Sequence, residues 1–126
     1  MKITKKYLQE HPDHIFVFGD NLLRLGYGGA AELRDEPNTY GFLTKKYPDN
    51  RESSFYAPIE YEGVYEREIR SLRAYILFFN AASPEKTFLI SNLGSGLANK
   101  YKIFEKIIEP RIKKDLADFK NVKFLW

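Results

Sequence analysis

The chain has 126 residues, of which 44% are hydrophobic and 16% aromatic, and it contains no cysteine. This composition indicates one globular domain over residues 1–126 and excludes disulfide scaffolds, thiolate metal sites and cysteine nucleophiles. The formal net charge of +3 comes from 20 basic and 17 acidic residues that are mixed along the chain. Such a balance permits anion binding but disfavours nucleic acid as a partner.

No feature of the sequence indicates a membrane protein or a secreted one. The first residues, MKITKKYLQEHPDH, include lysines but lack the apolar stretch of a secretory signal. No apolar run approaches the length that spans a bilayer. We therefore expect a cytoplasmic protein without a membrane partner, while a homo-oligomer formed through an exposed apolar helix face stays open.

The N-terminal third predicts a helix, a buried strand and a glycine-rich turn. Thr4 is a good N-cap for a short helix that ends before the HPDH turn. The continuous apolar run Ile15–Phe18, stopped by Gly19, is typical of a strand buried on both faces. In the next stretch, GDNLLRLGYGGAAELRDEPN, the glycines give way near Gly29 or Ala30 to residues that form a helix.

The rest of the chain alternates strands and helices. Residues 62–82 predict an amphipathic helix, which Ser83 and Pro84 end, because side chains such as Ile69 and Leu72 recur every three or four positions. The other expected elements are a strand at Tyr40–Thr44, a short edge strand at Phe55–Ile59, a buried strand at Thr87–Ser91 and a last strand at Val122–Trp126. A helix is expected from near Lys100, and Pro110 either kinks it or starts a second helix.

This alternation predicts an α/β fold: a three-layer domain with a mainly parallel, mixed sheet and helices on both faces. Ligands of such sheets bind just beyond the carboxyl ends of the strands. Two glycine-rich turns, residues 26–31 and 94–98, follow predicted strands. We therefore expect them to meet at one site.

The first turn contains Gly26, Gly28 and Gly29, which allow positive φ and a close approach of the backbone to a ligand. The helix start that follows would offer free N–H groups to a phosphate, although a purely structural turn is the alternative. Asp20 and Asn21 stand directly after the strand. They could contact an adenine or a ribose, or act in catalysis, or simply form an Asx turn or a helix cap.

The second turn places Ser95 between Gly94 and Gly96, which indicates a concave loop of backbone donors that could hold an anion. Neither turn matches the P-loop pattern or the dinucleotide fingerprint GxGxxG. ATP hydrolysis and hydride transfer are therefore disfavoured. No resident cofactor is expected.

Other side chains could complete this site. Thr44 and Lys45 follow the second strand and would add a cation, or else the lysine is merely solvated. Tyr27, Tyr40 and Phe55 could stack on a base, although each is more readily explained as core. The two histidines lie in the HPDH turn, where neither a metal site nor a Ser-His-Asp triad is easily built.

The predicted ligand-binding residues are Gly19, Asp20, Asn21, Gly26, Tyr27, Gly28, Gly29, Ala30, Thr44, Lys45, Asn92, Gly94, Ser95, Gly96 and Leu97.

Four segments in order, FVFGDN, GYGGAA, YGFLTKK and FLISNLGSGLA, resemble an uncharacterised phage and bacterial family. Its members carry FGxN, a GxGxAA-like turn, a lysine after a threonine and a late IGxGLA loop. More distantly the chain resembles macrodomains. That resemblance implies a macrodomain-like fold that binds ADP-ribose, with Asn21 at a sugar, residues 28–30 as the first phosphate loop and residues 95–97 as the second.

Three functions follow from these patterns. The leading hypothesis is a module that binds ADP-ribose or a related nucleotide, one version being a phage protein that sequesters a nucleotide immune signal. The second is a hydrolase of an ADP-ribosyl or nucleotide phosphoester bond, in which Asn21 or Asp20 positions water or substrate. The third, nucleic-acid binding through residues such as Lys46, Arg67 and Arg70, ranks last because the basic residues are interspersed with acidic ones.

Overall fold

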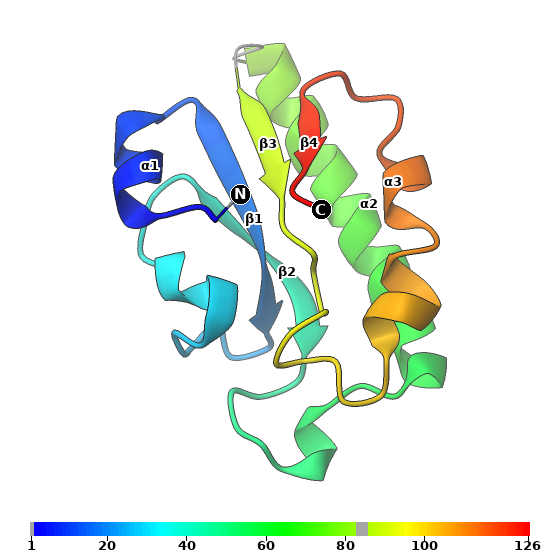
Figure 1. Cartoon of the computed structure of the whole chain (residues 1–126). Coiled ribbons are helices and arrows are strands. Elements are labelled where there is room, and N and C mark those ends of the chain that lie inside the picture. Colours follow the sequence, from blue (N-terminus) through cyan, green and yellow to red (C-terminus); the bar gives the residue numbers. More distant parts are fainter. Residues whose placement is uncertain (1, 83–85) are drawn as a thin grey trace.

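A sheet of four parallel strands forms the centre of the computed structural model, which describes residues 2–82 and 86–126. The strands lie in the order β2-β1-β3-β4 (Figure 1). They are β1 (His14–Asn21), β2 (Thr39–Lys45), β3 (Thr87–Ile90) and β4 (Val122–Phe124). The predicted α/β class is confirmed, but every strand pair in the described residues is parallel, so their sheet is not mixed.

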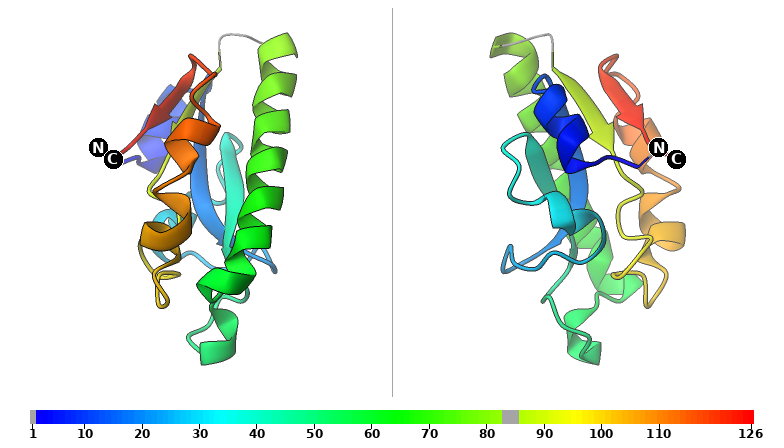
Figure 2. Two further views of the ribbon diagram at one scale, coloured as in Figure 1. Left: turned by 90° about the vertical axis from the view of Figure 1, so that its right-hand side faces the viewer. Right: turned by 60° about the vertical axis from the view of Figure 1, so that its left-hand side comes forward.

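Helical segments cover both faces of this sheet (Figure 2). One face carries α1 (Lys5–Glu10) and the 3-10 helix η1 (Gly29–Leu33). The other face carries α2 (Pro58–Ala82), the π-helical segment η3 (Phe104–Ile108) and α3 (Ile112–Asp115). A 3-10 turn, η2 (Glu52–Ser54), precedes α2.

The alternation of side chains along β1 explains both layers. Ile15 and Val17 are buried in the cluster that contains α2, η3 and α3, whereas Phe16 and Phe18 are buried in the cluster with α1 and η1. Successive side chains of a strand point to opposite faces, so a run of four apolar residues serves two cores. The prediction that Ile15–Phe18 is a strand buried on both faces is confirmed.

The connections follow the handedness rule for parallel strands. The chain moves from β1 to β2 through η1 on one face, and then from β2 to β3 through α2 on the opposite face and in the opposite direction. The step from β3 to β4 continues in that second direction and stays on the face of α2. Right-handed crossovers require this change of face whenever the direction reverses.

Two predicted boundaries near the site were wrong. Gly19 does not end β1: it pairs with Phe42 inside the sheet, and the strand continues to Asn21 across a register shift after Asp20. A β-carbon at Gly19 would lie 2.9 Å from Thr44 Oγ1. The glycine therefore leaves room for the Thr44 side chain on the neighbouring strand and does not form a turn. The predicted helix after the first glycines is a 3-10 helix of five residues.

The region before α2 also differs from its prediction. Residues 55–59 form no strand, because Pro58 begins α2, where its fixed φ and missing N–H suit a first helical turn. The Glu60 carboxylate accepts a hydrogen bond from the Ala57 N–H at 2.9 Å and so satisfies the helix start. The helix therefore begins four residues before residue 62. Its predicted end at Ser83 and Pro84 lies outside the described residues.

The C-terminal helix is shorter than predicted. Lys100 does not begin it, since the first helical segment is η3, in which Glu109 donates to the Phe104 carbonyl at 2.7 Å, and α3 follows Pro110. The last strand ends at Phe124. The predicted N-cap at Thr4 is confirmed, because its side chain accepts from the Tyr7 N–H at 3.1 Å. None of the helices described is both long and apolar enough to cross a membrane.

Candidate functional site

The loops that follow β1, β2 and β3 enclose a pocket of about 390 Å³, which we call the main pocket. It lies where the chain leaves neighbouring strands β1 and β3 in opposite directions, the point at which open parallel sheets leave a crevice. All fifteen predicted ligand-binding residues line it: Gly19, Asp20, Asn21, Gly26, Tyr27, Gly28, Gly29, Ala30, Thr44, Lys45, Asn92, Gly94, Ser95, Gly96 and Leu97. Their contact with a ligand stays a prediction.

Six further residues that were not among the predicted ligand-binding residues line the main pocket. They are Leu25, Ala31, Pro48, Ser91, Leu93 and Ala98. Four of them, Leu25, Ala31, Leu93 and Ala98, lie within or directly beside the two glycine-rich turns. Proximity to a glycine turn was the signal that could have found them.

The glycines of the first loop have two different roles. Gly26 and Gly29 have φ of 96° and 61°, a conformation that other residues adopt only with strain. Gly28 has an ordinary φ of −76°, but a β-carbon there would lie 2.8 Å from Leu97 Cδ1. Gly28 therefore leaves room for the exposed Leu97 side chain, which comes from the second loop.

The second loop contains two glycines with different surroundings: Gly94 is packed against other side chains, and Gly96 is not. Gly94 has φ of 81°, and its missing β-carbon would lie 3.0 Å from Ile108 Cδ1. Gly96 has no heavy atom within 4 Å of the place where a β-carbon would stand. Gly94 thus packs the loop onto η3, whereas Gly96 faces open space at the main pocket.

Both loops leave backbone donors unused. In the described part of the chain, the consecutive N–H groups of residues 28–30 donate to no acceptor, and neither do those of residues 96–98. Successive free N–H groups in a concave loop attract anions. Because η1 is a 3-10 helix of only five residues, an anion at these loops would be held by the free amides rather than by a helix dipole.

Asp20 is bound by two guanidinium groups. Its side chain is 5% exposed, with Oδ1 2.7 Å from Arg34 Nη2 and Oδ2 3.0 Å from Arg24 Nη1. Burial acts to raise the pKa of Asp20, but hydrogen bonds from Arg34, the Asn21 N–H and Arg24 outweigh it and hold the pKa below its ordinary value. Such a carboxylate is a poor general base and a good positioning group.

Arg34 connects this carboxylate to the first glycine loop, a role that sequence patterns missed. Its Nε donates to the Gly26 carbonyl at 2.9 Å and its Nη2 to the Leu25 carbonyl at 3.2 Å, while the guanidinium lies 5.4 Å from the centre of the Phe18 ring. One arginine therefore fixes the loop against the end of β1. No local pattern in the sequence indicates a contact between residues fourteen positions apart.

Asn21 forms the Asx turn that was the structural alternative for this residue. Its Oδ1 accepts from the Leu23 N–H at 3.0 Å, and its Nδ2 donates to the Leu25 carbonyl at 2.7 Å. One amide proton and one oxygen lone pair remain for a ligand. Asn21 thus shapes the loop with the same side chain that lines the main pocket.

Lys45 is the only lysine among the described residues that line the main pocket. It has no carboxylate within ion-pair distance among the described residues, and its Nζ lies 4.7 Å from the centre of the Phe55 ring. Burial lowers the pKa of Lys45, although Asp49 opposes this shift. Lys46 instead pairs with Glu60 at 3.1 Å and does not line the pocket. The neighbouring lysines therefore have separate roles.

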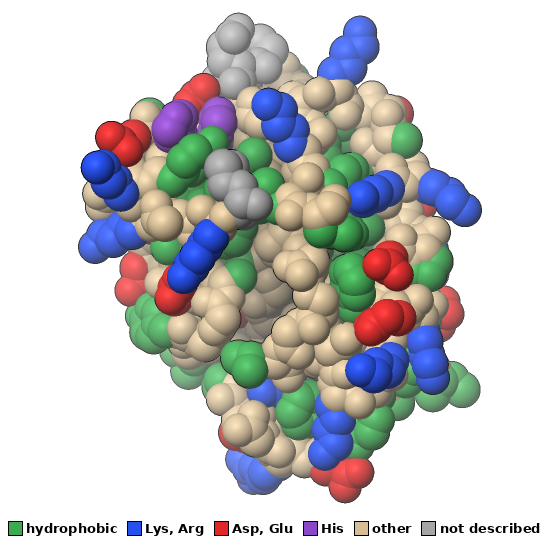
Figure 3. All heavy atoms as spheres, in the orientation of Figure 1, with side chains coloured by type: hydrophobic (Ala, Val, Ile, Leu, Met, Phe, Trp, Pro, Cys, Tyr) green, Lys and Arg blue, Asp and Glu red, His purple; other side chains and the backbone are tan. Residues whose placement is uncertain are grey.

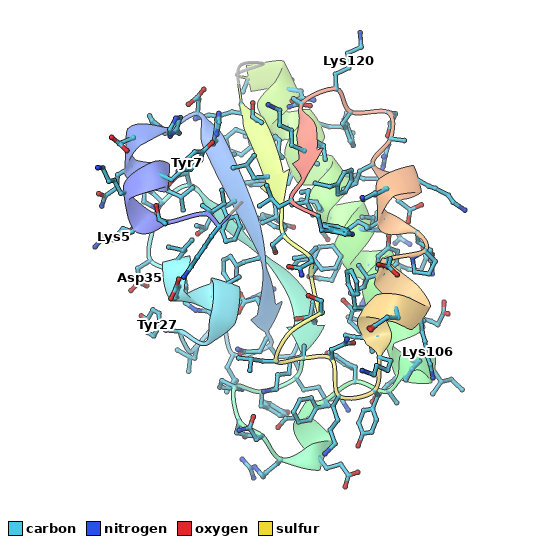
Figure 4. The ribbon with its side chains drawn as sticks, in the orientation of Figure 1. Lys5, Tyr7, Tyr27, Asp35, Lys106 and Lys120 are labelled. Carbon is cyan, nitrogen blue, oxygen red and sulfur yellow. The ribbon has the colours of Figure 1, made fainter. Side chains whose placement is uncertain are left out.

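The rim of the main pocket is apolar. Leu25, Tyr27 and Leu97 are each more than half exposed and line the pocket. Tyr27 lies beside η1 and donates to Asp35 at 2.9 Å (Figure 4). The other two stacking candidates, Tyr40 and Phe55, do not line the pocket. The ring centres of Tyr40 and Tyr75 are 4.5 Å apart. Phe55 is buried, and the Lys45 ammonium lies over its ring.

The lining of the main pocket suits binding better than proton transfer. Neither histidine lines the pocket; His11 stacks with both Tyr7 and His14 beside α1. Within residues 2–82 and 86–126, no three acidic or histidine side chains gather as a metal site would require. The groups that line the pocket are amides, hydroxyls, one lysine, the arginine-paired carboxylate of Asp20 and an apolar rim.

Comparison with known proteins identifies the family of this chain. The search of curated proteins and the search of solved structures each returned no match. A family model matches residues 1–99, a range that includes every residue lining the main pocket. The chain therefore belongs to the family described as a family of unknown function (DUF7831).

Proposed function

We propose that this protein binds an anionic, nucleotide-derived small molecule in the main pocket. The observation that carries the proposal is the meeting of two distant glycine loops: the six residues whose amides are unused line one pocket together with Lys45. Amides and a lysine are donors that suit phosphate oxygens. The volume of about 390 Å³ lies within the range of small-molecule sites.

The apolar rim supports a ligand that is more than a bare anion. Inorganic phosphate would leave Leu25, Tyr27 and Leu97 in water, whereas a nucleotide would cover part of them. ADP-ribose is the first compound to test, because the chain resembles macrodomains. Sequestration of a nucleotide immune signal by a phage protein is one form of the same proposal.

Binding without turnover is the favoured mode. Both carboxylate oxygens of Asp20 are engaged by arginines, and the Asn21 amide holds its own loop. Neither of the two candidate catalytic groups is free to activate water. Hydrolysis of an ADP-ribosyl or phosphoester bond is the alternative, and mass spectrometry of the recovered ligand distinguishes the two.

Calorimetry and thermal unfolding test the proposal with ADP-ribose, NAD, ADP, cyclic nucleotides and pyrophosphate. A ligand at one hundred times its Kd should stabilise the protein by about 2.7 kcal/mol. Gly96→Val should fold normally, because its side chain enters open space, and should lose at least tenfold in affinity. Gly63→Val, on the exposed surface of α2, is the matched control and should bind as the wild type does.

Two outcomes contradict the proposal. One is the absence of binding by every compound in the series. The other is a folded Gly96→Val variant that retains full affinity, since the ligand would then bind elsewhere.

A further inference from the structure

A second compartment adjoins the main pocket on the face of α1 and η1. It has a volume of about 340 Å³ and shares Gly29, Ala30, Ser91 and Asn92 with the main pocket. These shared residues come from the start of η1 and from the segment after β3. In Figure 3 the molecular surface is hollowed between these same two segments.

Large apolar side chains and a few polar groups line the second compartment. Apolar side chains form its walls: Ile3, Phe16 and Leu33 are buried, and Leu125 is half-buried. Its two ionic side chains, Lys2 and Glu32, are 3.9 Å apart and largely exposed, so they lie toward solvent. A charged group placed between the apolar walls would lose hydration without a partner. The compartment therefore suits an uncharged group.

Asn92 stands at the boundary between the two spaces. It is exposed, and its side-chain amide makes no hydrogen bond with the described residues. A free amide can donate and accept at the same time, which is the pattern that the edge of a nucleobase offers. The Ser91 hydroxyl, which also lines the compartment, already donates to the Val17 carbonyl at 2.9 Å. Large apolar side chains beside a free bifunctional amide match a flat heterocycle better than a sugar, whose hydroxyls need several partners.

We infer that the ligand has two parts and that an uncharged nucleobase occupies the second compartment while its phosphates occupy the main pocket. This inference rests on the proposed function. It assigns Ile3, Phe16, Leu33 and Leu125 to the base, with Asn92 at its polar edge. The ligand is then at least a complete nucleotide, because sugar phosphates and inorganic phosphates fill only one of the two spaces.

Competition between probes of increasing size tests this division. The probes are pyrophosphate, ribose 5-phosphate and ADP, measured by calorimetry on the full chain. ADP should bind at least tenfold more tightly than pyrophosphate. Glu32→Trp places a large ring at the second compartment from an exposed position and should weaken ADP at least tenfold while changing the affinities of the other two probes less than twofold.

Asn92→Ala provides a second variant that alters only an exposed side chain, and it should weaken ADP selectively. Gly96→Val should weaken all three probes. The inference is overturned if ADP binds no more tightly than pyrophosphate, or if both variants leave ADP affinity unchanged. Failure of the wild type to bind any probe would instead reject the proposed function itself.

Discussion

Replacing Asp20 by asparagine tests whether the buried carboxylate holds the first glycine loop in place. The substitution keeps the shape of the side chain but removes the charge that Arg34 contacts at 2.7 Å and Arg24 at 3.0 Å. Hydrogen bonds that involve a charge are about twice as strong as neutral ones, and removing one partner from a buried pair costs about 3–5 kcal/mol. Because the new amide oxygen could still accept hydrogen bonds, we expect a loss of about 2–3 kcal/mol for Asp20→Asn.

Urea denaturation at neutral pH measures this loss directly. In a chain of this size, a loss of about 2–3 kcal/mol in the free energy of unfolding corresponds to a fall in Tm of about 10 °C. Asp13→Asn is the matched control, since Asp13 is exposed and lies 4.0 Å from His14, and it should change the stability by less than about 0.5 kcal/mol. The Asp20→Asn variant should also bind phosphate ligands more weakly, because Arg34 would no longer hold the Gly26 and Leu25 carbonyls in place.

The pH dependence of the loss provides an independent check. The pKa of Asp20 is lower in the folded protein than its ordinary value of 3.8, so the folded state favours the charged form. The stability that this carboxylate contributes is therefore fully present above about pH 4 and is lost as the pH falls through the folded pKa. The difference between wild type and variant should shrink as the pH is lowered from about 7 to about 3. A difference below about 0.5 kcal/mol at neutral pH, or one that does not change with pH, would refute the reasoning.

Three further predictions concern glycines and acid stability. Gly41→Ala should destabilise the protein by about 1–3 kcal/mol in urea denaturation, because a β-carbon would clash with Asp20 Oδ2; a neutral effect would show that this carboxylate moves freely. Gly94→Ala should cost at least about 1 kcal/mol, since it adds strain at φ of 81° to a contact with Ile108, and Gly96→Ala, measured alongside, should cost almost nothing. Hydrogen bonds from Ser54 and Arg51 lower the pKa of Asp49 to about 2, and those from Arg73 do the same for Asp118, so acid titration should show stability falling between about pH 4 and pH 2. Asp118→Asn should flatten that part of the curve.

Local patterns in the sequence were enough to predict the central strands, the parallel sheet and the place of the two glycine turns. The apolar runs at Ile15–Phe18 and Thr87–Ile90 are typical of strands buried on two faces, and that predicted a parallel sheet. Parallel strands place their carboxyl ends at one edge, so the positions of the two glycine turns along the chain were enough to predict that they would meet. Hydrophobic periodicity and glycine content are properties of neighbouring residues, which a sequence displays directly.

Only the tertiary structure showed the features that depend on contacts between residues far apart in the sequence. Gly41 lies inside the strand predicted at Tyr40–Thr44, and only the structure shows that it makes room for the Asp20 carboxylate. Gly28 needs no positive φ, but it admits Leu97. The second compartment combines Ile3 and Leu125, which lie at opposite ends of the chain. Steric fit and ion pairing act through space, so they appear only after the sheet has brought these residues together.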